Sequence, residues 1–161
     1  MEFLKKEFNQ KKIKINNKAL SNQNKISILY ENEVLSQSSL HNTKNKFNSN
    51  LKNINQYKIE CITLDNYFYL RNKKEVIDLL KIDVEGEDLN VLKGSRDLLK
   101  NKKIKLIKIE LLNSFFRSGK KSNINEIIFF LNNYNYFLTT ITKTKYIDEK
   151  LLMMDVYFTY K

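Results

Sequence analysis

The sequence predicts an α/β fold built around one strand–helix–strand unit, residues 77 to 110. Ile77 to Val84 is mostly apolar, as expected of a strand buried on both faces of a parallel sheet. After Gly86 leucines recur at helical spacing, and residues 104 to 112 form a second apolar run. About twenty residues separate the two runs, which is enough for a helical crossover between parallel strands.

Polar residues mark the carboxyl ends of both predicted strands. Lys81 and Asp83 lie two positions apart, so they share one face of the strand, and Glu85 follows on that face. Glu110 occupies the corresponding part of the second strand. Ligands of open α/β sheets bind at the carboxyl ends of the strands, so we expect Asp83, Glu85 and Glu110 to converge on one crevice. Asp83 is the first candidate, because helix capping does not require an acid inside the strand.

The acids that open the predicted helix have a simpler interpretation. Glu87 and Asp88 stand at the helix start, where negative charge is favoured by the helix dipole. We therefore assign neither to the site. Gly94 predicts a break or cap within the helix. The apolar side of this helix comprises Leu89, Leu92, Leu98 and Leu99.

The remaining elements follow from local patterns. Asp65 is a candidate N-cap for a short helix, and Asn123 with Glu126 has the spacing of a capping box. The strands at 25–30 and 57–64 are expected to pair antiparallel. The full set of these predicted elements is a helix at 2–10, strands at 12–15, 25–30 and 57–64, a helix at 124–134, and strands at 136–142 and 152–160 around a turn at Asp148.

Three stretches of the chain resemble one family. Asp78 to Leu99, DLLKIDVEGEDLNVLKGSRDLL, is similar to the signature of the FkbM family of S-adenosylmethionine-dependent methyltransferases, a KIDVEG-type strand end followed by a VLKG-type helix. Ile62 to Tyr67, ITLDNY, resembles the family's TLD element, and Asn17 to Tyr30 resembles its ALS element with the strand that follows. The resemblance implies a Rossmann-like class I methyltransferase sheet, mostly parallel with an antiparallel C-terminal strand pair.

The chain departs from the family at its amino end. Members begin with a strand and a glycine-rich loop that cradles the cofactor, followed by a strand ending in an acid that holds the ribose. This chain has three glycines, at 86, 94 and 119, so no glycine-rich turn precedes residue 86. We therefore expect residues 1–161 to form a single partial methyltransferase domain, truncated at the N-terminus. The missing first strand would leave strand 77–84 with a bare edge.

The resemblance implies transfer of a methyl group from S-adenosyl-L-methionine to a hydroxyl of a sugar, lipid or small metabolite. By position, Asp83 and Glu85 would be the catalytic residues. His41, the only histidine, is a substrate-side candidate as a base, although a solvated loop histidine is the simpler interpretation. The implied contacts are Ala19, Leu20, Ser21 and Asp83 for the cofactor, and Glu110 with His41 for the acceptor.

The composition of the chain indicates which binding partners and which cell compartment to expect. Lysine and arginine outnumber acids 29 to 18, a net charge of +11 that favours an anionic partner. The basic residues are scattered among asparagines and isoleucines, as an AT-rich genome would encode, so nucleic acid is disfavoured. A single cysteine, Cys61, fits a reducing compartment, and no apolar run has the length of a membrane span. We expect a cytoplasmic protein and assign no metal ligands, since the sequence has no histidine or cysteine cluster and scattered carboxylates do not define a site; whether a metal assists stays open.

Three functional hypotheses remain open at this point. The chain is an active enzyme completed by a complementing N-terminal fragment or by self-association, or it is an inactive remnant. The third hypothesis is a basic module that keeps the fold and binds RNA or another polyanion.

Overall fold

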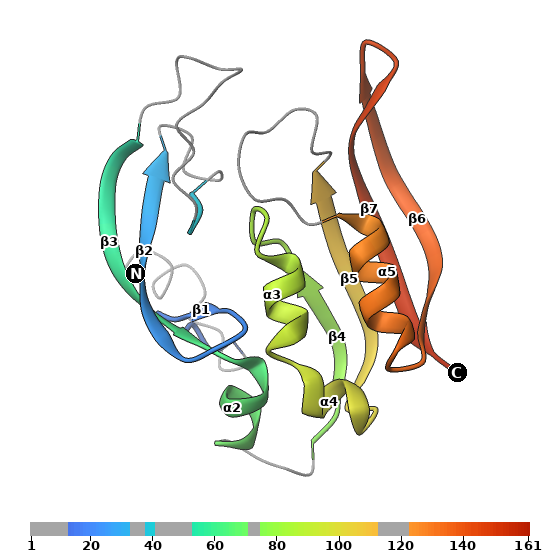
Figure 1. Ribbon diagram of the computed structural model, residues 1–161, viewed down its shortest axis with the longest axis horizontal. Helices are drawn as coiled ribbons and strands as arrows, with labels where there is room; N and C mark the ends of the chain where they lie inside the picture. Colours follow the sequence, from blue (N-terminus) through green and yellow to red (C-terminus); the bar gives the residue numbers. More distant parts are fainter. Residues whose placement is uncertain (1–12, 33–37, 41–52, 71–74, 113–122) are drawn as a thin grey trace.

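The computed structural model describes residues 13–32, 38–40, 53–70, 75–112 and 123–161, which form two sheets and four helices (Figure 1). The helix predicted at residues 2–10 lies outside the described residues. In chain order the elements are β1 (Ala19–Leu20), β2 (Lys25–Asn32), β3 (Asn53–Ile62), α2 (Leu64–Tyr69), β4 (Ile77–Ile82), α3 (Asp88–Lys93), α4 (Arg96–Lys100), β5 (Ile104–Leu112), α5 (Ile124–Asn132), β6 (Tyr136–Ile147) and β7 (Lys150–Tyr160).

The main sheet has the strand order β4-β5-β7-β6 and contains the predicted strand–helix–strand unit. β4 and β5 are parallel, with Ile77 opposite Ile104 and Ile82 opposite Ile109. β5 and β7 are antiparallel, and so are β7 and β6. Among the described residues β4 pairs only with β5, so it is an edge strand, as predicted.

The small sheet has the order β1-β3-β2, in which β1 is parallel and β2 antiparallel to β3. The predicted pairing of strands 25–30 and 57–64 is confirmed. The expectation of a mostly parallel sheet is not, because most strand pairings among the described residues are antiparallel. The chain reverses directly between β6 and β7 at Asp148 and Glu149, both at positive φ, and such a tight turn can join only antiparallel strands.

The apolar core lies between the main sheet and the helices α3, α4 and α5, which cover one of its faces (Figure 1). Alternation along the strands produces this arrangement, since successive side chains point to opposite faces. Ile107 and Ile109 of β5 are fully buried on the helix side, together with Val156 and Phe158 of β7. The fully buried helix residues include Leu92, Leu98, Leu99, Ile127 and Leu131.

The opposite face of the main sheet carries the charged residues of the same strands. Lys108 and Glu110 alternate with the buried isoleucines of β5, and the strand register places Tyr157 and Asp155 of β7 beside them. Lys81 of β4 lies opposite Lys108. No described helix covers this side, which we call the helix-free face.

Two local predictions fail for identifiable reasons. The strand expected at 12–15 is not found in its described part, residues 13–15, because residues 13–18 find no partner strand among the described residues and Ile13 is exposed. Asp65 is not the N-cap of its own helix. That role belongs to Thr63, whose hydroxyl accepts the N–H of Asn66 at 3.1 Å. The Asp65 carboxylate instead accepts the backbone N–H groups of Asp97 and Leu98, each at 3.0 Å, and so caps α4.

Other local predictions are confirmed. The predicted helix after Gly86 breaks at Gly94, which separates α3 from α4. Asn123 is the N-cap of α5, and its side-chain oxygen accepts the N–H of Asn125 at 2.9 Å. The two C-terminal strands are present and longer than predicted, because the ladder extends to the residues flanking the turn at Asp148.

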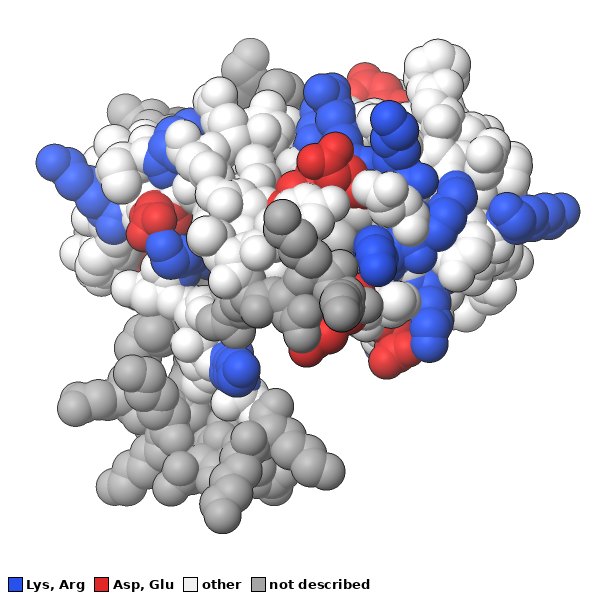
Figure 2. Space-filling view, turned by 90° about the horizontal axis from the view of Figure 1, so that it is seen from below, with Lys and Arg blue, Asp and Glu red and all other residues white. Residues whose placement is uncertain are grey.

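Basic residues gather where the main sheet begins. Figure 2 shows lysines and arginines over the part of the surface formed by α4, the turn that follows it and the C-terminal end, with acidic residues among them. Lys105 pairs with Asp78 at 2.6 Å, which neutralises part of this charge. The surface lies at the amino ends of β4 and β5, the end of the sheet opposite the predicted site.

Candidate active site

The chain leaves β4 through a turn formed by Asp83 to Glu87, which we call the β4 turn. Glu85 has a φ of 53° and Gly86 a φ of 101°, and the N–H of Glu87 donates to the carbonyl of Val84 at 3.3 Å. Glycine adopts positive φ freely, whereas a residue with a Cβ is destabilised there by roughly 1 kcal/mol. The backbone at Glu85 is therefore held in place by its surroundings.

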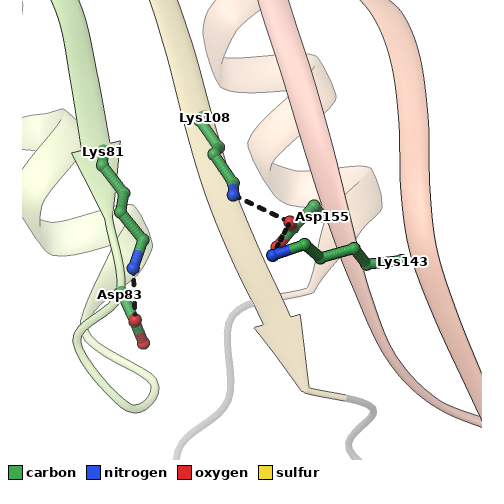
Figure 3. Close-up of polar contacts among 5 residues, drawn as sticks. All are labelled: Lys81, Asp83, Lys108, Lys143 and Asp155. Carbon is green, nitrogen blue, oxygen red and sulfur yellow. Dashed lines mark hydrogen bonds and ion pairs between the residues drawn. The ribbon is translucent and has the colours of Figure 1, made fainter.

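Asp83 stands at the start of this turn on the helix-free face (Figure 3). Its Oδ2 lies 2.9 Å from the Nζ of Lys81, and both side chains are about half exposed. The hydrogen bond to Asp83 and the charge of Asp83 raise the pKa of Lys81, and the charge of Glu110 raises it further. Lys81 lies opposite Lys108, and Asp83 and Glu110 each follow two positions later, so both acids stand at the carboxyl ends of adjacent parallel strands.

Glu85 lies at the tip of the turn, two residues after Asp83. Its backbone carbonyl accepts the hydroxyl of Ser39 at 3.2 Å. Ser39 in turn exchanges backbone hydrogen bonds with Tyr30 of β2, so the small sheet contacts the β4 turn here. His41, the predicted acceptor-side base, lies outside the described residues.

Glu87 is the site residue that the sequence interpretation missed. Its side chain is almost fully buried, at 6% exposure. Oε2 accepts the side-chain amide of Asn90 at 2.9 Å and lies 3.4 Å from the hydroxyl of Ser21. Asp88 is buried as well, so neither acid is merely a solvated helix-start charge. The i, i+3 spacing of Glu87 and Asn90 was the one sequence signal for this contact.

These contacts form a polar seam between the small sheet and the β4 turn. We use this name for Ser21, Ser39, Glu85, Glu87 and Asn90. Ser21 and Ser39 are 1% and 3% exposed. The seam therefore joins the two sheets through shielded polar groups.

The predicted cofactor contacts in β1 and just after it have structural roles. Ala19 and Leu20 pair with Cys61 and Ile62 of β3, and Leu20 packs against the apolar core. The N–H of Ser21 donates to the carbonyl of Ile62 at 3.0 Å. Ser21 also reaches the β4 turn, because its hydroxyl is the group that contacts Glu87.

Cys61 lies next to the polar seam and is 1% exposed. Burial raises the pKa of its thiol, and the negative charge of Glu87 raises it further, whereas Lys25 lowers it. A thiol with a raised pKa is a poor nucleophile. We therefore assign Cys61 no chemical role.

A second charged group lies on the helix-free face, shown in Figure 3 beside Lys81 and Asp83. Asp155 is fully buried, and its Oδ2 lies 2.8 Å from the Nζ of Lys108 and 3.7 Å from that of Lys143. The hydrogen bond from Lys108 to Asp155 raises the pKa of the lysine. Glu110 is the cross-strand partner of Asp155, so the pair adjoins the predicted site residues.

Two other kinds of site are not found in the part of the chain that the structure describes. Within those ranges, no set of three or more histidine, cysteine, aspartate or glutamate side chains is placed to hold a metal ion. The helices in the same ranges are all too short or too polar to cross a bilayer.

The fold and the site define an α/β protein with paired acidic and basic groups at the carboxyl ends of two parallel strands. The model of the methyltransferase FkbM domain matches residues 2–138. The chain therefore belongs to the FkbM methyltransferase family, as its sequence motifs indicated. Comparison with curated proteins and with solved structures gives no match.

Proposed function

We propose that this chain is an S-adenosylmethionine-dependent methyltransferase that methylates a hydroxyl of a sugar, lipid or small metabolite. The observation that carries the proposal is the group Lys81, Asp83 and Glu110 at the carboxyl end of the parallel β4–β5 pair, in a chain of the FkbM family. Ligands of open α/β sheets bind at this edge.

The described residues fit one part of the cofactor. Its methionine end carries a sulfonium and an ammonium group besides its own carboxylate, and partly exposed carboxylates of the protein suit the two positive charges. Asp83 and Glu110 would hold that end. The sequence offers no glycine-rich turn ahead of Gly86, so we assign no residue to the nucleoside end.

When bound, the cofactor supplies an electrophilic methyl group on a positively charged sulfur. The protein then has to align an acceptor hydroxyl with that methyl group and receive the proton that the hydroxyl loses. Asp83 can accept this proton, since its carboxylate is about half exposed at the edge of the sheet where ligands bind. The bound cofactor would supply the methyl group and would leave as a neutral thioether, and Asp83 would hold the proton from the acceptor hydroxyl.

Methyl transfer from tritiated S-adenosylmethionine to a panel of hydroxylated sugars, lipids and small metabolites tests the proposal. We expect a labelled product from at least one class, and a loss of roughly a hundredfold or more in turnover for Asp83→Asn. Asp97→Asn is the matched control, because this acid lies in α4 at the other end of the sheet. Near-normal turnover by Asp83→Asn would show that Asp83 does not accept the proton.

A further inference from the structure

The buried polar side chains of the described residues lie mostly in one place. Apart from Asp155, they are Ser21, Ser39, Glu87, Asp88 and Ser95, all on or beside the βα segment that follows β4 and the loops of the small sheet that meet it. Buried polar groups are costly unless they are hydrogen-bonded, so a concentration of them specifies one arrangement of the segments that they join.

This arrangement fixes the β4 turn from two sides. Ser39 binds the carbonyl of Glu85, the residue at φ 53°. Glu87, at the other end of the turn, binds Asn90 in α3 and contacts Ser21 at the end of β1. The turn that these two contacts hold also contains Asp83, two residues before Glu85, so the position of both acids depends on the seam.

A backbone contact supports the same arrangement. The hydrogen bond from the N–H of Asp65 to the carbonyl of Gly94 measures 3.0 Å, and Ser21 lies directly against Gly94. The small sheet is therefore in contact with both ends of α3. The carboxylate of Glu87 contacts Ser21 across the interface and Asn90 on its own side of it.

We propose that Glu87 is a positioning residue for methyl transfer, which holds the β4 turn in its strained conformation by binding Asn90 and Ser21. The role of Glu87 in methyl transfer rests on the proposed function, whereas its role in holding the turn does not. The turn itself can be tested without any ligand. Glu87 does not touch the reacting groups and acts through the turn that presents Asp83.

The ligand-free test uses Cys61, the only cysteine of the chain, as a reporter. Cys61 is 1% exposed in β3, and the charge of Glu87 raises the pKa of its thiol. A thiol reagent can reach Cys61 only when this region opens, so the reaction rate reports opening of the seam. Glu87→Ala removes both the charge and the hydrogen bonds. Glu87→Gln removes the charge and keeps a carbonyl oxygen that accepts from Asn90 and Ser21.

Comparison of the two variants distinguishes the effect of the hydrogen bonds of Glu87 from the effect of its charge. We expect Cys61 to react at least tenfold faster in Glu87→Ala, and within about threefold of wild type in Glu87→Gln, because the glutamine retains the hydrogen bonds. Glu126→Ala, an exposed acid in the first turn of α5, should leave the rate unchanged. Equal acceleration in both Glu87 variants would mean that only the charge matters, and no acceleration in Glu87→Ala would mean that the seam does not depend on Glu87. Either result overturns the proposal.

The catalytic part is tested by titration with S-adenosylhomocysteine, the product form of the cofactor. Glu87→Ala should weaken binding roughly tenfold and Glu87→Gln should restore it, since rescue by an isosteric amide requires the hydrogen bonds of the turn. Unchanged affinity in Glu87→Ala would show that Glu87 does not position the cofactor site. If wild-type protein binds no S-adenosylhomocysteine, the proposed function fails for this chain, and the Cys61 rates still decide whether Glu87 anchors the turn.

Discussion

The carbonyl oxygen of Ser21 occupies the space where a side chain at position 94 would begin. A Cβ built on Gly94 would lie 2.1 Å from that oxygen and 3.1 Å from the carbonyl carbon. A Cβ so close to a backbone oxygen is essentially never found in folded proteins, so one of the two segments would have to move. Gly94 therefore permits β1 to pack against the break between α3 and α4, and this packing places Ser21 beside Glu87.

Gly94→Ala tests this close approach. We expect a loss of about 2 kcal/mol or more in the free energy of unfolding, because the clash is with backbone and cannot be relieved by a rotamer change. Urea unfolding followed by circular dichroism measures the loss. Lys100→Ala, an exposed position in α4, is the control and should change stability by less than about 0.5 kcal/mol. Equal stability of Gly94→Ala and wild type would mean that β1 does not pack here.

Asp65→Ala removes the side chain that caps α4. Two backbone N–H groups, those of Asp97 and Leu98, lose their acceptor, and we expect a loss of about 1 to 2 kcal/mol in stability. Asp97→Ala is the matched control, because it removes an acid from the same first turn without removing the cap. Thermal unfolding of both variants should rank Asp65→Ala well below Asp97→Ala. The reverse ranking would contradict the capping role.

The pH dependence of stability at alkaline pH depends on Tyr136. This side chain is fully buried, its hydroxyl donates to the carbonyl of Ile104 at 2.6 Å, and burial raises its pKa to about 12. The folded protein keeps this proton while an unfolded tyrosine, with an ordinary pKa near 10, has already lost it. The contribution of Tyr136 to stability is therefore fully present below pH 10 and is lost as the pH rises from 10 toward 12.

Spectrophotometric titration of tyrosine ionisation, paired with unfolding at pH 8, 10 and 11, measures this effect. Tyr136→Phe should remove the late-titrating tyrosine and lower stability at pH 8 by about 1 to 2 kcal/mol, because the Ile104 carbonyl loses a donor. Tyr146→Phe, at an exposed position of β6, should do neither. Ionisation of all tyrosines near pH 10 in the folded protein would rule out the buried hydroxyl.

Breaking the ion pair between Asp155 and Lys108 should lower the free energy of unfolding strongly. Asp155→Asn leaves Lys108, which is only 16% exposed, without its anion, and we expect a loss of about 3 kcal/mol. Lys143→Ala should cost less than about 1 kcal/mol, since this side chain is 68% exposed and 3.7 Å from the carboxylate. Replacing both members of the buried pair, as Asp155→Leu with Lys108→Met, should recover much of the loss. Similar losses for Asp155→Asn and Lys143→Ala would show that Lys108 is not the principal partner.

Local sequence patterns predicted the strand–helix–strand unit, the break at Gly94, the cap at Asn123 and the C-terminal strand pair. Each depends on periodicity or on residues within one turn of each other, so a single sequence carries the signal. The position of Asp83 and Glu110 on one side of adjacent strands followed from the same periodicity, because side chains alternate along a strand.

The missed features depend on partners far away in the chain. Ser21 and Glu87 are 66 residues apart, and Asp65 lies 33 residues before Leu98, whose N–H it binds. At these separations no local pattern distinguishes a buried, hydrogen-bonded acid from a solvated one. Asp65 therefore resembled the cap of its own helix, and Glu87 resembled an exposed helix-start charge. The two predicted antiparallel pairs are present, but the expectation of a mostly parallel sheet was not confirmed, since the balance of parallel and antiparallel pairs depends on which strands meet and not on a local pattern.

Calorimetric titration of the purified chain with S-adenosylhomocysteine decides whether the carboxyl end of β4 is a cofactor site. We expect binding in the micromolar range by wild-type protein, and roughly tenfold weaker binding by Asp83→Asn, because the amide removes a negative charge from beside the ammonium group, the positive charge that S-adenosylhomocysteine keeps after the sulfonium is lost. Asp97→Asn should bind as wild type does. Absence of binding by a chain that unfolds cooperatively would contradict a cofactor site at β4, and so would equal binding by wild type and Asp83→Asn.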